Sequence, residues 1–302
     1  MGQKDMTEKL LEDYNDVFAD IYNVLVFEND VIDEMRLRDG TTESVYKAED
    51  GEYREQRRDV MKIYLDEYQM ELAYVGIDNQ TSVDKYIPVR VLGYDYAKYR
   101  RQVDEMVFPL LPVITLVLNF SDRKWNGCKS LAEITKVSPE FAPHFQDYKV
   151  KVVDVAFLED SVIEKFKSDF KLVAKFFKNR RLGIEPLGDT TEIKHVTELV
   201  DFISVFANDL EYKNIQGFLS RLKEKGEQVS MCYVAQGLIE KGRIEGEIKL
   251  AELMEYLLSN GMIEEAKEAA SREDVRVKMY KKYGIGKSTE VKDCVELESV
   301  SV

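Results

Sequence analysis

A nearly continuous apolar run at residues 113–120, VITLVLNF, constrains the fold of this 302-residue chain more than any other segment. The run is rich in β-branched residues and does not alternate between apolar and polar side chains, so it predicts a strand buried on both faces. Such a strand needs a covering layer on each side of its sheet, and helical patterns occur before and after it. The sequence therefore predicts an α/β fold, in which a mixed central sheet lies between two helical layers.

Two shorter strand patterns, at residues 60–65 and 71–77, predict an antiparallel hairpin that carries polar side chains at its open end. Asp59 precedes the first strand, and Asp78 and Gln80 close the second. Residues i and i+2 of a strand face the same side, so Asp78 and Gln80 point together, with Asp59 across from them. Two carboxylates and an amide oxygen form a set that suits Mg²⁺. The alternative is that these are ordinary solvated side chains at strand ends.

Residues 7–27 have the apolar spacing of an amphipathic helix, in which Glu12 lies early, where the helix dipole favours negative charge. Asp20 lies on the flank of the apolar face, from which it either reaches a site on the sheet or remains solvated. A second helix is predicted from about Pro88 to Val107. Its cations make it the most basic local segment and the place to expect DNA phosphate contacts, unless they only balance nearby acids. The candidate DNA-binding residues are Arg90, Lys98 and Arg101.

The remaining chain divides by character. Residues 28–56 are acidic, contain turn signals and predict an irregular connecting arm, whereas residues 148–158 predict another strand. Beyond residue 159 the pattern is almost entirely helical. We expect a domain at 1–180, a helical C-terminal region at 181–283 that serves self-association or regulation, and a disordered tail at 284–302.

Composition excludes several classes of protein. The net charge of −14 argues against broad, non-specific nucleic-acid binding, although it allows a local basic groove. Three widely spaced cysteines indicate neither a disulfide framework nor a zinc cluster. Neither an apolar signal core nor an 18-residue apolar stretch is present, which predicts a cytoplasmic protein with no membrane partner. The two histidines lack ligand partners in the sequence, so histidine catalysis is not indicated.

Several short motifs occur in the order that characterises one family. The chain resembles the Rpn family of recombination-promoting nucleases, which belongs to the PD-(D/E)xK superfamily. The resemblance covers about residues 10–180 and extends to the glycine-containing helix near residues 240–249. The motifs that carry it are FADIYN at 18–23, RDV at 58–60, GIDNQTSVD at 76–84, IPVR at 87–90 and GYD at 93–95, followed by Tyr99 and Gln102.

The resemblance implies a restriction-endonuclease-like core and a Mg²⁺-dependent DNA endonuclease that promotes recombination. It places Asp59, Asp78 and Gln80 at the catalytic site, and Asp59 and Asp78 with Asp20 at the metal. The chain has Asp78 where the family usually has Glu, and the shorter side chain shifts the carboxylate by about 1.5 Å. An octahedral Mg²⁺ site tolerates that shift poorly. The alternative function is therefore a catalytically weakened interaction module that acts through its helical C-terminal region. Expected partners are DNA and a second copy of the chain.

Overall fold

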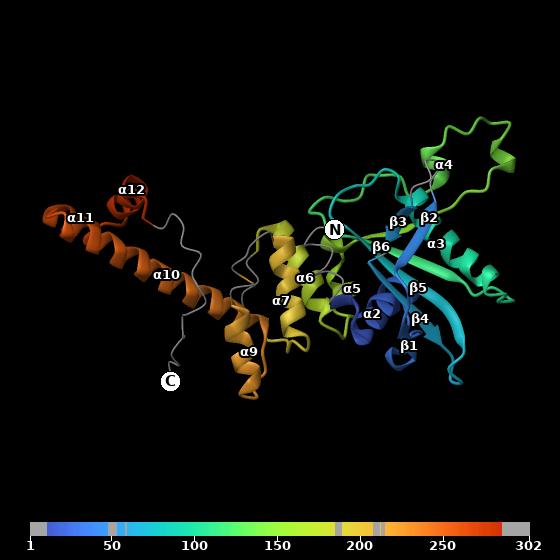
Figure 1. Ribbon diagram of the computed structural model, residues 1–302, viewed down its shortest axis with the longest axis horizontal. Coiled ribbons are helices and arrows are strands. Elements are labelled where there is room, and N and C mark those ends of the chain that lie inside the picture. Colours follow the sequence, from blue (N-terminus) through green and yellow to red (C-terminus); the bar gives the residue numbers. More distant parts are fainter. Residues whose placement is uncertain are drawn as a thin grey trace.

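The computed structural model describes residues 11–47, 53–57, 59–184, 189–207, 212 and 215–285. The expected disordered tail lies outside this part of the chain, apart from its first two residues, Gly284 and Ile285. The molecule is elongated, with a β-sheet at one end and the long helix α10 (Met231–Ser259) extending away from it at the other (Figure 1). Among the described helices, none combines the length and apolar character needed to cross a membrane.

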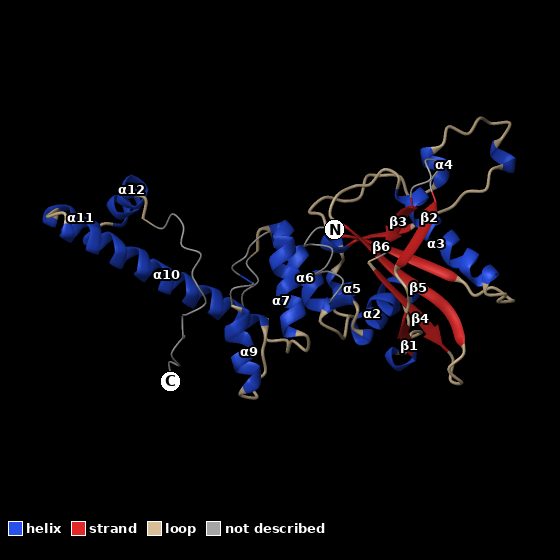
Figure 2. Ribbon diagram, in the orientation of Figure 1, coloured by secondary structure: helices blue, strands red, loops and turns tan. Residues whose placement is uncertain are grey.

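The central sheet is mixed, as the sequence predicts, and its strands follow the order β1-β4-β5-β6-β7 (Figure 2). The first three pair antiparallel, whereas β5, β6 and β7 run parallel. The bounds are Leu37–Asp39 for β1, Val60–Leu65 for β4, Glu71–Gln80 for β5, Val113–Asn119 for β6 and Lys151–Asp154 for β7. The predicted hairpin is thus β4–β5, and its register pairs Val60 with Ile77.

Strand β6 is buried on both faces, which confirms the interpretation of the apolar run. Leu116 and Leu118 belong to the large core on one side of the sheet. Val117, which points the other way, packs in a smaller cluster with Val91 and Trp125. Alternate residues of a strand face opposite sides, so this division of neighbours identifies two covered faces.

Helices from distant parts of the chain form the two covering layers. On one face lie α2 (Asn15–Tyr22), which continues as a π-helical turn, and α6 (Phe170–Leu182). The hydroxyl of Tyr22 donates to the carbonyl of Gly76 at 2.6 Å and fastens α2 to the sheet. On the other face lies α3 (Ile87–Asp104), which has proline in its first turn as predicted.

The prediction of an irregular arm at residues 28–56 is wrong for much of that segment. It contains β1 and a separate hairpin of β2 (Glu43–Lys47) and β3 (Tyr53–Arg57). These strands are three to five residues long and their sequences lack an apolar alternation. Each pairs with a neighbouring strand, and a local sequence pattern does not reveal that pairing.

The large core continues into the C-terminal half of the chain. One cluster of buried side chains extends from Leu11 to Val234 and crosses residue 181, where the sequence suggests a domain boundary. It includes α7 (Val196–Ala207), α9 (Gln216–Glu224) and the start of α10. The short helices α4 (Leu131–Ile134) and α5 (Asp160–Ile163) complete the sheet-containing end of the molecule.

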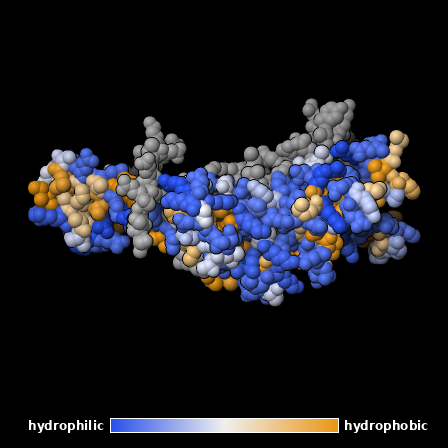
Figure 3. Space-filling view, turned by 90° about the horizontal axis from the view of Figure 1, so that it is seen from below, coloured by the Kyte–Doolittle hydropathy of each residue, from blue (hydrophilic) through white to orange (hydrophobic). Residues whose placement is uncertain are grey.

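The far end of α10 carries a separate core. Helices α11 (Ile263–Ser271) and α12 (Glu273–Tyr283) pack on it through Leu253, Leu257, Ala266, Ala269 and Met279. Between residues 238 and 252 the helix has no buried residue. Apolar side chains gather at the α11–α12 end of the surface (Figure 3). The exposed ones there include Leu258, Ile263 and Val277.

Candidate active site

The end of the β4–β5 hairpin brings Asp78 and Gln80 together on the face of the sheet that α3 covers. Both side chains are buried, with 2% of Asp78 and 8% of Gln80 exposed. The amide nitrogen Nε2 of Gln80 donates a hydrogen bond to Oδ1 of Asp78. Val60 pairs with Ile77 in the antiparallel register. Asp59, one residue before Val60, therefore lies opposite Asp78, one residue after Ile77. The two strand ends therefore carry the three predicted residues side by side.

Arg90, in the first turn of α3, contacts the same carboxylate. Its Nη2 donates to Oδ1 of Asp78 at 2.6 Å, and its Nη1 lies 3.3 Å from Oδ2 of Asp84. Burial lowers the pKa of the Arg90 guanidinium, but Asp78, with Tyr94 and Asp84, more than offsets this and raises the pKa overall. The sequence assigns Arg90 to DNA phosphate, whereas its partners here are two carboxylates of its own chain.

Asp59 is bound from the neighbouring strand. Its Oδ2 accepts a 2.5 Å hydrogen bond from the backbone N–H of Asn79. The side chain of Asn79 points to the opposite face from Asp78, where its Nδ2 donates to Oε2 of Glu12 at 2.6 Å. Asp59 is half-buried and directly precedes β4.

Glu12 is a polar residue of this region that the sequence does not single out, because an acid in an early helical turn is ordinarily solvated. It is entirely buried. Burial raises the pKa of its carboxyl well above the usual value of 4.5; the Asn79 hydrogen bond lowers it only in part, and the charges of Asp59 and Asp13 raise it further. The pattern of apolar residues around Glu12 gives no sign of this burial.

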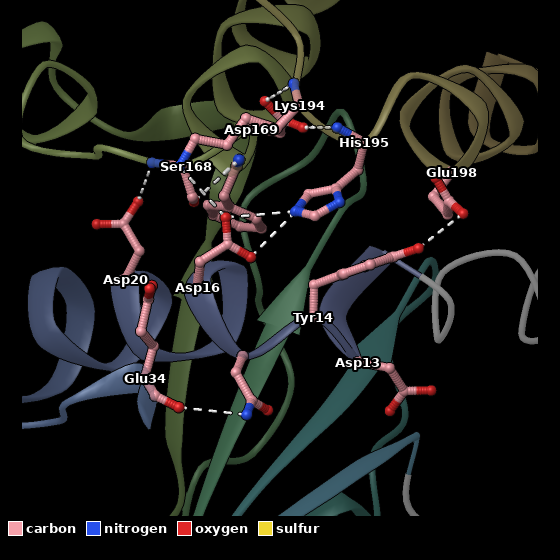
Figure 4. A network of polar contacts seen from close by, with 12 residues as sticks. Asp13, Tyr14, Asp16, Asp20, Glu34, Ser168, Asp169, Lys194, His195 and Glu198 are labelled. Atoms are coloured by element: carbon pink, nitrogen blue, oxygen red, sulfur yellow. Dashed lines mark hydrogen bonds and ion pairs between the residues drawn. The ribbon is translucent and has the colours of Figure 1, made fainter. Parts of the chain in front are cut away.

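Asp20, the expected third metal carboxylate, is engaged elsewhere. Its Oδ2 accepts hydrogen bonds from the backbone N–H groups of Lys167 at 2.8 Å and Ser168 at 2.7 Å (Figure 4). These bonds hold the segment before α6 against α2. Within the described ranges, no three His, Cys, Asp or Glu side chains are placed to hold one metal ion. The structure therefore does not gather Asp20, Asp59 and Asp78 into one carboxylate cluster.

The remaining predicted DNA-binding residues differ from each other. Lys98 is buried, and its Nζ lies 4.6 Å from the centre of the Tyr74 ring. Arg101 is exposed, with Nε donating to Oε1 of Glu105 at 2.8 Å and Nη1 donating to the Thr41 hydroxyl at 3.1 Å. Only Arg101 of these two presents its charge at the surface of α3.

A second polar network fastens α2 to α7 (Figure 4). Nε2 of His195 lies 3.0 Å from Oδ1 of Asp16, and the His195 ring stacks on that of Tyr14. Asp169 accepts the backbone N–H groups of Lys194 and His195. His195 thus contacts side chains that join two parts of the fold, in keeping with the absence of ligand partners for it in the sequence.

The donor set at the hairpin end fits a hard cation in its chemistry. Carboxylates and amide oxygens are the ligands that Mg²⁺ prefers, and the ion commonly takes only one or two carboxylates from a protein. Asp59 and Asp78 would supply these, the Gln80 side chain lies next to Asp78, and water or a phosphate oxygen would complete the shell. The arrangement is suited to metal-assisted chemistry on a phosphate ester.

Comparison with known proteins gives one match. The model of a family described as "Putative transposase, YhgA-like" matches residues 47–201, slightly more than half of the chain. The matched segment contains Asp59, Asp78, Gln80 and Arg90, and it begins after Glu12 and Asp20. Neither the curated proteins nor the solved structures give a significant match.

Proposed function

Because the chain belongs to the family of YhgA-like putative transposases, which is the Rpn family that its motifs resemble, we propose that it is a Mg²⁺-dependent DNA endonuclease. The observation that carries this proposal is the meeting of Asp78 and Gln80 on one face of β5, beside Asp59 at the end of β4. The family supports a role in DNA transposition or recombination in general. The hydrolytic reaction and its metal are our inference from the residues at this site.

Asp59 and Asp78 would hold the metal in the proposed reaction. When bound, Mg²⁺ would lower the pKa of a water molecule and neutralise charge that develops on the phosphate. Gln80 cannot act as a general base, so its amide would orient the water or contact the phosphate. The backbone N–H of Asn79 holds the Asp59 carboxylate in place at the hairpin end.

DNA would approach along the N-terminal part of α3 and its exposed cations. We propose that Arg90 binds a phosphate when Asp78 is engaged by the metal, and that Arg101 contacts the backbone further along the helix. Lys98 would support this surface indirectly, because it is buried against Tyr74. With a net charge of −14, the chain relies on such a local set of cations rather than on a general attraction for DNA.

We further propose that the chain self-associates through its C-terminal helices and works in the cytoplasm. Leu258, Ile263 and Val277 expose apolar surface at the α10–α12 end, which a second copy would cover. Cys128 and Cys232 are free thiols, which is consistent with a reducing compartment.

One observation favours a second candidate function, an interaction module with weakened catalysis. The guanidinium of Arg90 already neutralises Asp78, so the fold does not require a metal ion to balance this buried carboxylate. A plasmid cleavage assay with and without Mg²⁺ separates the two functions. Metal-dependent nicking by the purified chain supports the endonuclease, and its absence under all metal conditions supports the interaction module.

A further inference from the structure

Two buried oxygen atoms on the α2 face of β5 have no hydrogen-bond partner in the described part of the chain: Oε1 of Glu12 and Oδ1 of Asn79. Their side chains are joined by the 2.6 Å bond from Nδ2 of Asn79 to Oε2 of Glu12. When Glu12 is ionised, each remaining oxygen is only an acceptor, so neither can satisfy the other. Buried polar atoms without partners are rare and costly, and a pair of them on bonded neighbours calls for a donor or a cation between them.

Among the described residues, two further carboxylates lie near this pair. Asp59 is held by the backbone N–H of Asn79, and both Asp59 and Asp13 lie near enough to act electrostatically on Glu12. The nearby cation Lys62 is committed elsewhere, because its Nζ donates to the carbonyl of Asp13 and pairs with the carboxylate of Asp39. The site therefore repels anions and favours a positively charged ligand.

We propose that Glu12, Asn79 and Asp59 bind a hard divalent cation, such as Mg²⁺ or Mn²⁺, on the α2 face of β5. All three provide oxygen, and the set contains no sulfur or imidazole that would favour zinc. Two carboxylates and one amide oxygen leave the rest of the shell to water. Asp59 is half-buried, and its exposed part gives the ion a route from solvent.

This second site extends the proposed function. It rests on that function only because the two sites share Asp59. Asp78 and Gln80 lie on the α3 face of the strand, whereas Asn79 and Glu12 lie on the α2 face. Asp59 is the one ligand that the two sites would share.

Mn²⁺ binding to the full-length protein without DNA tests the proposal, with the free ion measured by electron paramagnetic resonance. Glu12→Gln keeps the side-chain volume and the acceptor for Asn79 but removes the charge. We expect it to weaken Mn²⁺ binding at one site at least tenfold and to reduce the rise in Tm that Mn²⁺ causes. Asn79→Asp adds a carboxylate and is expected to enlarge that rise above the wild-type value.

Equal Mn²⁺ affinity and stoichiometry in the wild type and Glu12→Gln would overturn the proposal. If Glu12→Gln does not fold, Asn79→Asp decides: a Tm rise no larger than that of the wild type rejects the site. Asp78→Asn separates this site from the endonuclease. If Asp78→Asn alone loses the ion and the wild type nicks DNA, the Glu12 site fails and the endonuclease stands. If Glu12→Gln loses the ion while the wild type never nicks DNA, the site stands and the endonuclease fails.

Discussion

Arg90 donates a 2.6 Å hydrogen bond to Oδ1 of Asp78, the same oxygen that accepts from the Gln80 amide. This pair joins the first turn of α3 to the end of β5 and neutralises a carboxylate that is only 2% exposed. The Arg90 guanidinium thus binds the carboxylate oxygen that the expected metal ion would use. Any metal at Asp78 must compete with Arg90, and the released guanidinium would then be available to a phosphate.

Replacing Arg90 with alanine should destabilise the protein by about 2–4 kcal/mol, because it leaves Asp78 buried without its cation. Mg²⁺ should recover part of this loss and raise the Tm of the variant more than that of the wild type. Urea unfolding with and without Mg²⁺ measures both effects. Arg100→Ala, on the exposed side of the same helix, serves as the control and should change stability by less than about 0.5 kcal/mol. Equal stability of Arg90→Ala and the wild type would contradict the role assigned to the pair.

Replacing Asp59 with alanine should abolish Mg²⁺-dependent nicking of plasmid DNA while thermal stability changes little. Asp59→Asn is the matched variant, since its amide oxygen can still accept the N–H of Asn79. Loss of the charge alone should reduce the nicking rate by about 100-fold or more. Nicking at the wild-type rate, or a loss explained by unfolding in circular dichroism, would defeat the assignment of Asp59 to the metal.

Replacing Asp78 with glutamate restores the residue that is usual in the family. The longer side chain should bring the carboxylate closer to the metal and raise the nicking rate. The added methylene enters a buried position, so we expect a loss of stability of about 1–3 kcal/mol. Parallel nicking and urea-unfolding measurements check the two effects. A more stable but inactive Asp78→Glu variant would argue for the interaction module.

Glu12 makes stability depend on pH. Its folded-state pKa is raised by burial, so the folded protein holds this proton more tightly than the unfolded chain. The contribution is favourable below the usual pKa of 4.5 and is lost as the pH rises through the folded-state value. In metal-free buffer, Glu12→Gln should therefore gain stability over the wild type as the pH is raised from 4.5 towards 8. Thermal unfolding of both proteins across this range tests it, and parallel curves would show that Glu12 does not titrate on folding.

Ending the chain after residue 238 should remove self-association without unfolding the sheet domain. This cut removes the exposed part of α10 with α11 and α12, but it keeps α9 and Val234, which belong to the large core. Light scattering coupled to size-exclusion chromatography should show a fall from an oligomer to a monomer. An unchanged oligomeric state would place the self-association surface elsewhere.

The sequence predicts those helices and strands whose own residue types indicate which side chains will be buried or where the element begins. Strand β6 has apolar residues on both faces, and α3 starts at a proline, so each is evident from the residues that form it. Strands β1, β2 and β3 are not, because their pairing depends on neighbours and their residues show no apolar alternation.

The same distinction applies to the candidate site. The spacing of Asp78 and Gln80 is enough to place them on one face, since both lie on one strand. The contacts of Arg90, Glu12 and Asp20 depend on how α2 and α3 pack against the sheet, which the local sequence does not specify. The sequence therefore identifies Arg90 and Asp20 as candidate site residues, but it does not identify the groups that they contact.

The middle of α10, which has no buried residue, separates the α11–α12 pair from the sheet. At 1.5 Å per residue, its 29 residues span about 43 Å, so the α11–α12 pair is held well away from the sheet. Two copies joined end to end through those helices would hold their hairpin ends more than about 80 Å apart, which corresponds to over 20 base pairs of DNA. Such a pair could bridge distant positions on one duplex, or two separate duplexes, but could not place both centres on the same step of the double helix.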